Sequence, residues 1–241
     1  MSVVGHRVGG TMTDVFPIPG LEHLQPAAPS RGPSVEDLLE GLNEPQRAAV
    51  QHAGAPLLVV AGAGSGKTRV LTRRIAWLLS QRKAHPGSIL AITFTNKAAA
   101  EMKERVEDLV GKRARIMWVS TFHSACVRIL RKEAERLGYK SSFSIYDAAD
   151  SKRLMQLVCN DLELDPKKFQ PRAVLNWVSN AKNELQDPEE AREAAQNSFE
   201  EQYAAAYTAY QRRLGEANAM DFDDLIMNVV RLFQTLSLIH I

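Results

Sequence analysis

The feature that most constrains the fold is a glycine-rich segment, AGAGSGKT, at residues 61–68. It follows an apolar run at residues 56–60 and precedes a helical pattern that starts at Arg69. Glycines let the backbone turn tightly and approach a ligand closely, and the amides that follow converge at a helix N-terminus, where anions bind. The order of strand, glycine-rich turn and helix is typical of a phosphate-binding loop, the Walker A motif.

The last two residues of this segment suit the phosphates of a nucleotide and its metal ion. The Lys67 ammonium can reach the β- and γ-phosphates, and the Thr68 hydroxyl can coordinate Mg²⁺. The general motif begins with glycine, whereas this chain has Ala61, and a glycine-rich turn that binds nothing is the alternative. The predicted binding residues are Ala61, Gly62, Ala63, Gly64, Ser65, Gly66, Lys67 and Thr68, with Lys67 and Thr68 also predicted to be catalytic.

The composition of the 241-residue chain is that of an ordinary globular protein, with 45% hydrophobic and 24% charged residues. A net charge of +2 does not by itself indicate a nucleic-acid partner. The sequence contains no apolar run near the roughly 20 residues of a membrane span, and the N-terminus has no signal-peptide layout. Its two cysteines, Cys126 and Cys159, match no zinc spacing with His123 and are predicted to pack as small apolar groups.

Strand and helix patterns alternate after residue 56. Strands are predicted at 57–61, 89–93 and 116–120, and helices at 67–81, 97–110 and 122–137. Repeated strand–helix units predict an α/β fold, in which a parallel sheet with right-handed crossovers has helices on both faces. Ligands of such sheets bind at the carboxyl ends of the strands, where the informative motifs of this chain lie.

The chain divides by composition into four parts. Residues 1–39 are rich in proline and glycine and are predicted to be a disordered extension. Residues 40–137 hold the alternating pattern, residues 138–214 are predicted to be an all-helical insertion, and residues 215–241 return to the first part. Proline breaks the helical pattern near residues 166, 171 and 188. A stripe formed by Tyr203, Tyr207 and Tyr210 is interpreted as core rather than as a DNA-stacking surface.

Four more segments carry a family resemblance. They read LNEPQRAAV at 42–50, TFTNKAAAEM at 93–102, STFHSACVRIL at 120–130 and MDFDDLI at 220–226. With AGAGSGKT, their order and spacing resemble the N-terminal part of superfamily 1 DNA helicases of the UvrD/PcrA/Rep type, most closely the PcrA branch, over about residues 40–235. The resemblance implies a P-loop NTPase with a RecA-like lobe and an inserted helical subdomain.

The resemblance also implies roles for individual residues, with ATP and Mg²⁺ as cofactors and single-stranded DNA and duplex junctions as partners. Gln46 matches the residue that reads adenine, although it could be only a capping residue, and Arg69 matches an arginine near the nucleotide. Phe94 matches an aromatic residue that stacks on a DNA base, with a core position as the alternative. The remaining residues implied to contact DNA are Thr93, Thr95, Asn96, Thr121, Phe122 and His123, and for His123 a purely structural role is equally open.

The acidic cluster at residues 221–224 is not interpreted as the Walker B motif, because no buried apolar strand precedes it. Asp221 is instead predicted to cap a helix. The family's Walker B acids and second lobe do not occur in this sequence, so we expect a truncated front part, with about the last six residues outside the family pattern.

For the parent protein the resemblance implies an ATP-dependent 3′-to-5′ DNA helicase of DNA repair and replication, in the bacterial cytoplasm with the nucleoid. This fragment alone is expected to hydrolyse ATP poorly or not at all. Two alternatives stay open: the front end of a helicase–nuclease repair subunit, and a non-catalytic module that binds nucleotide and DNA.

Overall fold

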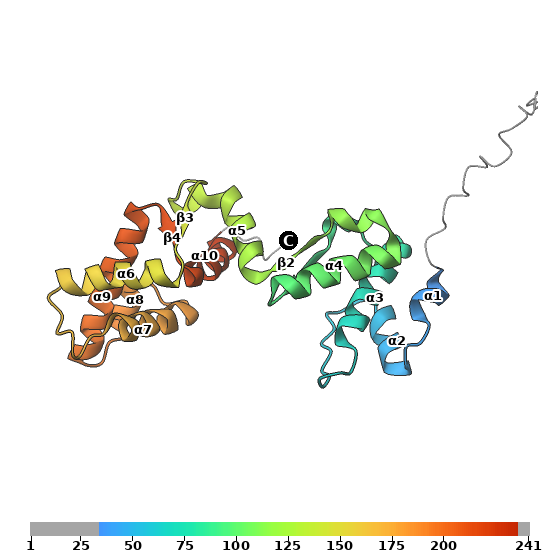
Figure 1. Ribbon diagram of the computed structural model, residues 1–241, viewed down its shortest axis with the longest axis horizontal. Helices are drawn as coiled ribbons and strands as arrows, with labels where there is room; N and C mark the ends of the chain where they lie inside the picture. The colour runs from blue at the N-terminus through green and yellow to red at the C-terminus, as the bar shows by residue number, and fades with distance from the viewer. Residues whose placement is uncertain (1–33, 236–241) are drawn as a thin grey trace, which may run out of the picture.

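The computed structural model describes residues 34–235, which form a mostly helical α/β structure with two short parallel sheets. Figure 1 shows α1 to α4 at one end of the molecule and α6 to α9 at the other, with α5 and α10 between them. Residues 1–33 and 236–241, which include most of the predicted extension and the last six residues, lie outside the described residues. The elements are α1 (Val35–Leu39), α2 (Glu44–Gln51), α3 (Lys67–Ser80), β1 (Leu90–Thr93), α4 (Asn96–Val110), β2 (Trp118–Thr121), α5 (Phe122–Glu133), β3 (Ser144–Ile145), α6 (Ala148–Asp161), α7 (Pro171–Asn183), α8 (Pro188–Glu193), α9 (Ser198–Glu216), β4 (Ala219–Met220) and α10 (Phe222–Thr235).

The parallel pairing predicted for the second and third strands is confirmed. β1 pairs with β2 in register, from Leu90 opposite Trp118 to Thr93 opposite Thr121. α4 forms the crossover between them, as a parallel connection requires. The core of this part joins α2, α3 and α4 to the strands, with Val50, Ala76 and Val106 fully buried. The register brings the carboxyl ends of β1 and β2 side by side.

The strand predicted at 57–61 is not formed, and that prediction is wrong. Leu58 and Val60 are 86% and 87% exposed, and the whole apolar run is irregular. A strand is held by hydrogen bonds to a neighbouring strand. Within residues 34–235, β1 and β2 pair only with one another, and residues 57–61 pair with neither. The parallel sheet is therefore smaller here than the sequence predicts, although α3 starts where it was expected.

The folded part also begins earlier than residue 40. Ser34 and Asp37 form a reciprocal capping box at the start of α1, and Leu38 is fully buried. The Arg73 guanidinium donates hydrogen bonds to the carbonyls of Asp37, Leu38 and Glu40 at 3.2, 2.7 and 2.8 Å, which satisfies the end of this short helix. The predicted disorder is thus wrong for residues 34–39, since five helical residues are too few to show a period in the sequence.

The helical region from α6 to α9 has its own core. Tyr207 and Tyr210 are buried in it as predicted, while Tyr203 is half-buried and stacks on Trp177 with ring centroids 5.7 Å apart. Cys159 is buried in the same core, and Cys126 of α5 is buried in the cluster that α5 forms with α10, so both cysteines pack as small apolar groups. Irregular segments interrupt the helices at the predicted proline breaks.

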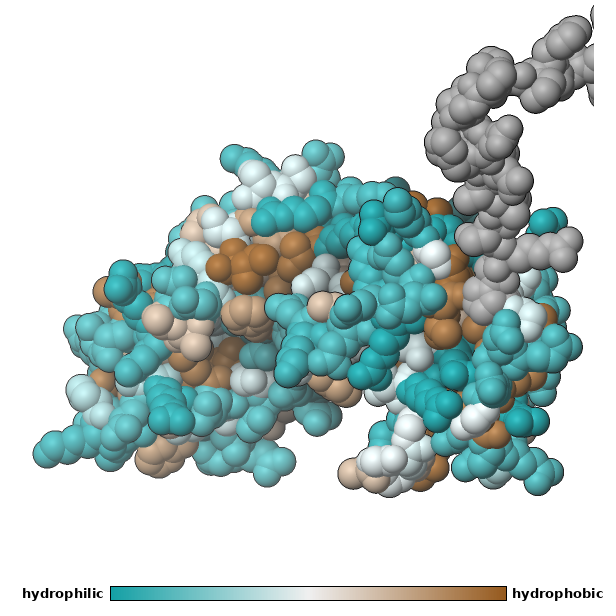
Figure 2. Space-filling view, turned by 45° about the vertical axis from the view of Figure 1, so that its right-hand side comes forward, coloured by the Kyte–Doolittle hydropathy of each residue, from teal (hydrophilic) through white to brown (hydrophobic). Residues whose placement is uncertain are grey.

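A second parallel pair, β3 with β4, was not predicted, because two residues per strand give no readable pattern. It brings the chain back from α9 to α10, which packs against α5 and α7. Asp221 caps α10 as predicted, since its carboxylate accepts the Asp224 amide at 2.8 Å. No helix within residues 34–235 is long and apolar enough to cross a membrane. Figure 2 shows hydrophobic residues exposed among hydrophilic ones on one face of the molecule.

Candidate nucleotide and DNA site

The phosphate loop has the backbone shape that its glycines predict. Gly64 and Gly66 have φ values of +76° and +83°, a left-handed conformation that side chains disfavour. Gly66 begins α3 without any side-chain cap and with no acidic residue in the first turn, whereas Thr95 and Thr121 cap α4 and α5. The first amides of α3 therefore keep their hydrogen-bonding capacity for an anion, which fits a nucleotide phosphate.

The Lys67 side chain folds back across this loop. Its ammonium donates hydrogen bonds to the carbonyls of Ala61 and Gly62 at 2.8 and 2.6 Å, and the Ser65 hydroxyl donates to Gly62 at 2.7 Å. These contacts hold the ammonium inside the curve of the loop. Phosphate oxygens entering the loop would replace the carbonyls as its partners. Thr68 follows on the first turn of α3 and is exposed, so its hydroxyl is accessible to a metal ion.

Gln46 joins the start of α2 to the phosphate loop. Its Oε1 accepts the Asn43 amide at 3.1 Å, which completes a capping box, while its Nε2 donates to the Ser65 carbonyl at 3.1 Å. A Cβ on Gly66 would lie 3.3 Å from the same Nε2, so only glycine leaves the amide its normal space. Gln46 therefore has a capping role and, in addition, a direct contact with the predicted nucleotide site.

The Arg69 guanidinium forms its contacts outside the phosphate loop. It reaches the turn between α1 and α2, where it donates to the Glu40 carbonyl at 3.4 Å and sits against Gly41. The predicted role of Arg69 near the nucleotide stays a prediction, and in this conformation the side chain ties α3 to α1.

Phe94 and Phe122 form an exposed aromatic pair directly after β1 and β2. Phe94 is 90% exposed, Phe122 is 44% exposed, and their ring centroids are 5.4 Å apart. The alternative of a core position for Phe94 is wrong. Two large apolar rings left open to solvent next to one another form a surface on which flat ligands can stack.

The polar residues around this pair shape its backbone. The Thr93 hydroxyl donates to the Thr95 carbonyl at 2.9 Å, and the Thr95 hydroxyl accepts the Ala98 amide at 3.1 Å at the start of α4. The Thr121 hydroxyl accepts the Ser124 amide at 3.3 Å at the start of α5. Asn96 is exposed beside Phe94. The three threonines therefore position the aromatic residues, whatever else they contact.

His123 contacts a residue that the sequence analysis did not assign to the site. Its ring meets the ring of Phe222 edge to face, with centroids 5.3 Å apart, and Phe222 is 47% exposed. Phe222 is the first residue of α10 and lies far along the chain. The MDFDDLI segment was the available signal, but only the fold shows that Phe222 lies against His123, the chain neighbour of Phe122.

A buried ion cluster, also missed, fixes the start of α10. The Lys182 ammonium of α7 is fully buried and lies 2.7 Å from Asp221 and 2.8 Å from Asp224. The Tyr210 hydroxyl donates to Asp221 at 3.0 Å, and the Gln211 amide donates to Asp224 at 3.1 Å. Burial lowers the pKa of Lys182, but the two carboxylates raise it above the ordinary value. Burial raises the pKa of Asp224 more than Lys182 lowers it.

The comparisons with known proteins identify the family of the chain. A model of the UvrD/REP helicase N-terminal domain matches residues 42–240. The chain belongs to this family. The match includes residues 236–240, so it does not support the expected departure from the family pattern there. The family membership makes this a P-loop NTPase fragment with the mixed α/β architecture described above.

Individual relatives of this UvrD-type chain are bacterial. It is 59% identical over 208 residues to "ATP-dependent DNA helicase UvrD1" of Mycobacterium tuberculosis (strain ATCC 25618 / H37Rv), covering 84% of this chain and 27% of the relative. It is 51% identical over 196 residues to "ATP-dependent DNA helicase PcrA" of Bacillus subtilis (strain 168), covering 81% and 26%. The chain therefore spans about a quarter of the length of these relatives.

Proposed function

We propose that this chain is the ATP- and single-stranded-DNA-binding front part of an ATP-dependent 3′-to-5′ DNA helicase that acts in DNA repair and replication. The observation that carries the proposal is that one small lobe has two exposed features that suit ligands. One is a phosphate loop whose helix has no side-chain cap, and the other is the exposed pair of Phe94 and Phe122. The helicase names of the relatives support the same conclusion.

The nucleotide part of the proposal assigns roles to the loop amides and to three side chains, those of Lys67, Thr68 and Gln46. The loop amides and Lys67 bind the β- and γ-phosphates of ATP, and the Thr68 hydroxyl holds Mg²⁺. When bound, the metal ion neutralises charge on the phosphate oxygens. Gln46 is already hydrogen-bonded to Ser65 and so links adenine recognition to the shape of the loop. A side-chain amide offers the donor and acceptor that the adenine edge requires.

The DNA part of the proposal rests on stacking. Each base stacked on an aromatic side chain contributes about 1–3 kcal/mol irrespective of its sequence. Phe94 and Phe122 supply such faces, with Asn96 and His123 beside them for polar contacts. A motor that moves along DNA of any sequence requires this kind of contact. We propose that the helicase acts at duplex junctions. We also propose that the protein is located in the cytoplasm with the chromosome. The bacterial origin of the relatives supports this location.

For the fragment alone, we propose binding with little or no hydrolysis. Two of the three carboxylates at the start of α10, Asp221 and Asp224, are bound to buried Lys182 and so are not available as metal ligands for ATP. This favours the non-catalytic module as the behaviour of the isolated chain. The alternative for the full-length protein is a helicase–nuclease repair subunit.

The test is a pair of assays on the purified 241-residue chain, one for nucleotide binding and one for ATP hydrolysis with and without single-stranded DNA. We expect ATP binding that Lys67→Ala abolishes, together with weak hydrolysis that DNA does not stimulate. Equal ATP affinity in Lys67→Ala would refute the phosphate-loop assignment. DNA-stimulated turnover would show that a carboxylate of this chain completes the catalytic site.

A further inference from the structure

A patch of basic side chains lies at the amino ends of β1 and β2, at the edge of the sheet opposite the exposed aromatic pair. The two strands are parallel and in register, so the turns that lead into them come together. Residues 81–89 precede β1 and residues 111–117 precede β2, and the short helical turns within them, Pro86–Ser88 and Lys112–Ile116, are in contact. We call the surface of these two turns the basic patch.

The basic patch carries positive charge that nothing nearby along the chain compensates. Neither turn contains an acidic residue, and together they contain five exposed basic ones: Arg82, Lys83, Lys112, Arg113 and Arg115. The Arg115 guanidinium lies 2.6 Å from the Glu107 carboxylate, whereas the other four have no ion-pair partner among residues 34–235. The formal net charge of the whole chain is only +2, so this local excess favours an acidic partner.

A cavity of about 260 Å³ opens within the basic patch. Its walls are largely apolar, and the residues that line it are Leu79, Arg82, Ala84, His85, Pro86 and Arg113. The His85 Nδ1 accepts the Gly87 amide at 3.1 Å, so the proton of the neutral ring is on Nε2, which is left as a donor. The cavity therefore combines apolar walls with N–H donors from three side chains.

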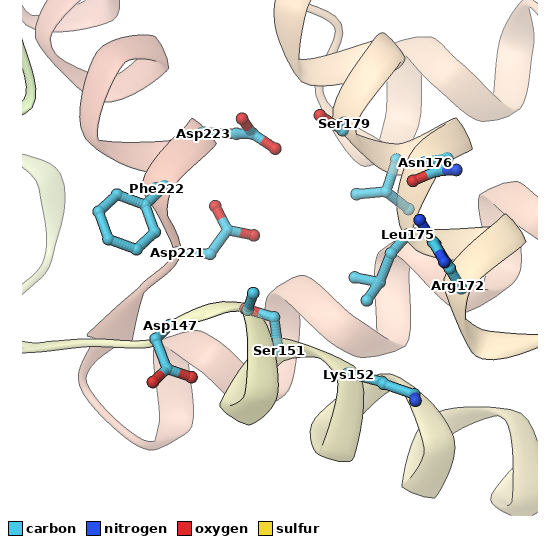
Figure 3. A pocket seen from close by; sticks show the side chains of 12 residues that line it. Asp147, Ser151, Lys152, Arg172, Leu175, Asn176, Ser179, Asp221, Phe222 and Asp223 are labelled. Atoms are coloured by element: carbon cyan, nitrogen blue, oxygen red, sulfur yellow. The ribbon is translucent and has the colours of Figure 1, made fainter.

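A larger cavity elsewhere in the fold has a different balance of charge. It has a volume of about 520 Å³ and lies between α6, α7 and the start of α10. Figure 3 shows Asp221 and Asp223 on one side of it and Arg172 and Lys152 on another. Charges of both signs line that cavity, so it favours neither sign of ligand. The cavity in the basic patch is lined by one sign of charge and selects acidic ligands.

The basic patch is separate from the proposed nucleotide and DNA sites. α3 begins at the phosphate loop, and its 14 residues place the following Arg82 about 20 Å from that loop. The four residues of each strand place the amino ends about 10 Å from the carboxyl ends, which lead to Phe94 and Phe122. A nucleotide on the loop and a base stacked on Phe94 therefore leave the basic patch open.

We propose that the basic patch binds an acidic segment of a partner protein, and that one apolar side chain of this segment enters the cavity. The planar guanidinium groups of Arg82 and Arg113 suit carboxylates, and the His85 Nε2–H adds a donor. Pockets that hold whole small ligands measure about 300–1,000 Å³, so a smaller cavity suits one side chain of a longer ligand. A nucleic-acid backbone brings negative charge without such a side chain, so the cavity favours a peptide.

The test is an anisotropy titration of the full 241-residue chain with a labelled acidic peptide of about eight residues that has one central leucine. Replacing this leucine by serine should weaken binding about tenfold, because the cavity then loses its apolar occupant. Combining Arg82→Glu with Arg113→Glu should weaken binding at least about tenfold, and Arg82→Gln with Arg113→Gln should retain part of the affinity.

Arg172→Glu is the matched control, because it makes the same change of charge at the cavity of Figure 3. In salt of about 0.15 M, charges farther apart than about 8 Å are largely screened, so this variant should bind the peptide as the unchanged chain does. Unchanged circular dichroism spectra and unchanged ATP binding show that the variants of the basic patch are folded.

The proposal is supported if the leucine peptide binds, the serine peptide binds more weakly, and only the variants of the basic patch lose affinity. It is overturned by failure of the unchanged chain to bind the leucine peptide, by equal affinity for both peptides, or by an equal loss in Arg172→Glu. A loss of single-stranded DNA binding larger than the loss of peptide binding would assign the patch to DNA and also overturn it. ATP and DNA binding by the unchanged chain test the proposed function independently.

Discussion

Lys182→Met should destabilise the fold more than most single substitutions do. The Lys182 side chain is 0% exposed, and the Asp221 and Asp224 side chains that it neutralises are only 10% and 3% exposed. Methionine matches the aliphatic stem but leaves two carboxylates uncompensated in the core. Removing one partner of a buried ion pair costs about 3–5 kcal/mol, a large share of the roughly 5–15 kcal/mol by which domains are stable.

Urea unfolding followed by circular dichroism measures this loss. With a slope of about 1–3 kcal/mol per molar urea, the midpoint should fall by about 1–5 M. Arg212→Met is the matched control, because Arg212 also forms a short ion pair, 2.6 Å from Glu216, but the two side chains are 62% and 60% exposed. Such pairs contribute about 1 kcal/mol or less.

Adding Asp221→Asn and Asp224→Asn to Lys182→Met should restore part of the lost stability, since the uncompensated charges then disappear. A midpoint for Lys182→Met equal to that of Arg212→Met would refute the reasoning. It would mean that the buried carboxylates are already protonated at neutral pH and need no counter-ion.

Three further results are expected. Phe94→Ala should weaken single-stranded DNA binding by about 1–3 kcal/mol for every sequence in an anisotropy titration, and a loss confined to one sequence would contradict stacking. Gln46→Ala should lower the preference for ATP over GTP in competition binding, and an unchanged preference would leave Gln46 with its capping and loop contacts alone. The folded chain should lose stability as the pH rises above about 10, because burial raises the pKa values of Tyr207 and Tyr210, and the carboxylates raise that of Lys182, above their unfolded values. Chemical unfolding at several alkaline pH values checks the sign, and a rise in stability there would contradict it.

The sequence predicts those features of this fold that depend on nearby residues. The phosphate loop, the start of α3, the cap at Asp221 and the parallel order of β1 and β2 each follow from residues within one strand–helix unit. The strand predicted at 57–61 fails for the opposite reason, because a strand exists only through hydrogen bonds to other strands. Its apolar composition is visible in the sequence, whereas the presence of a partner is not.

The same distinction applies to the site. Phe94 and Phe122 can be predicted to meet, because parallel strands in register end at the same edge. The contact of His123 with Phe222, and the burial of Lys182, depend on how α10 packs against α5 and α7. No spacing along the chain reports that packing, and a lysine in an amphipathic helix is ordinarily solvated.

These contacts imply that the proposed nucleotide and DNA sites depend on different parts of the chain. The phosphate loop is supported by α1, α2 and α3, through Gln46, Arg69 and Arg73. The contact between His123 and Phe222 depends on α10, whose first turn is held by Lys182 from the helical region. Weakening the Lys182 cluster should therefore disturb the contact of Phe222 with His123 while leaving the phosphate loop intact. The helical region is in this sense a structural support of the proposed DNA face rather than an insertion beside it.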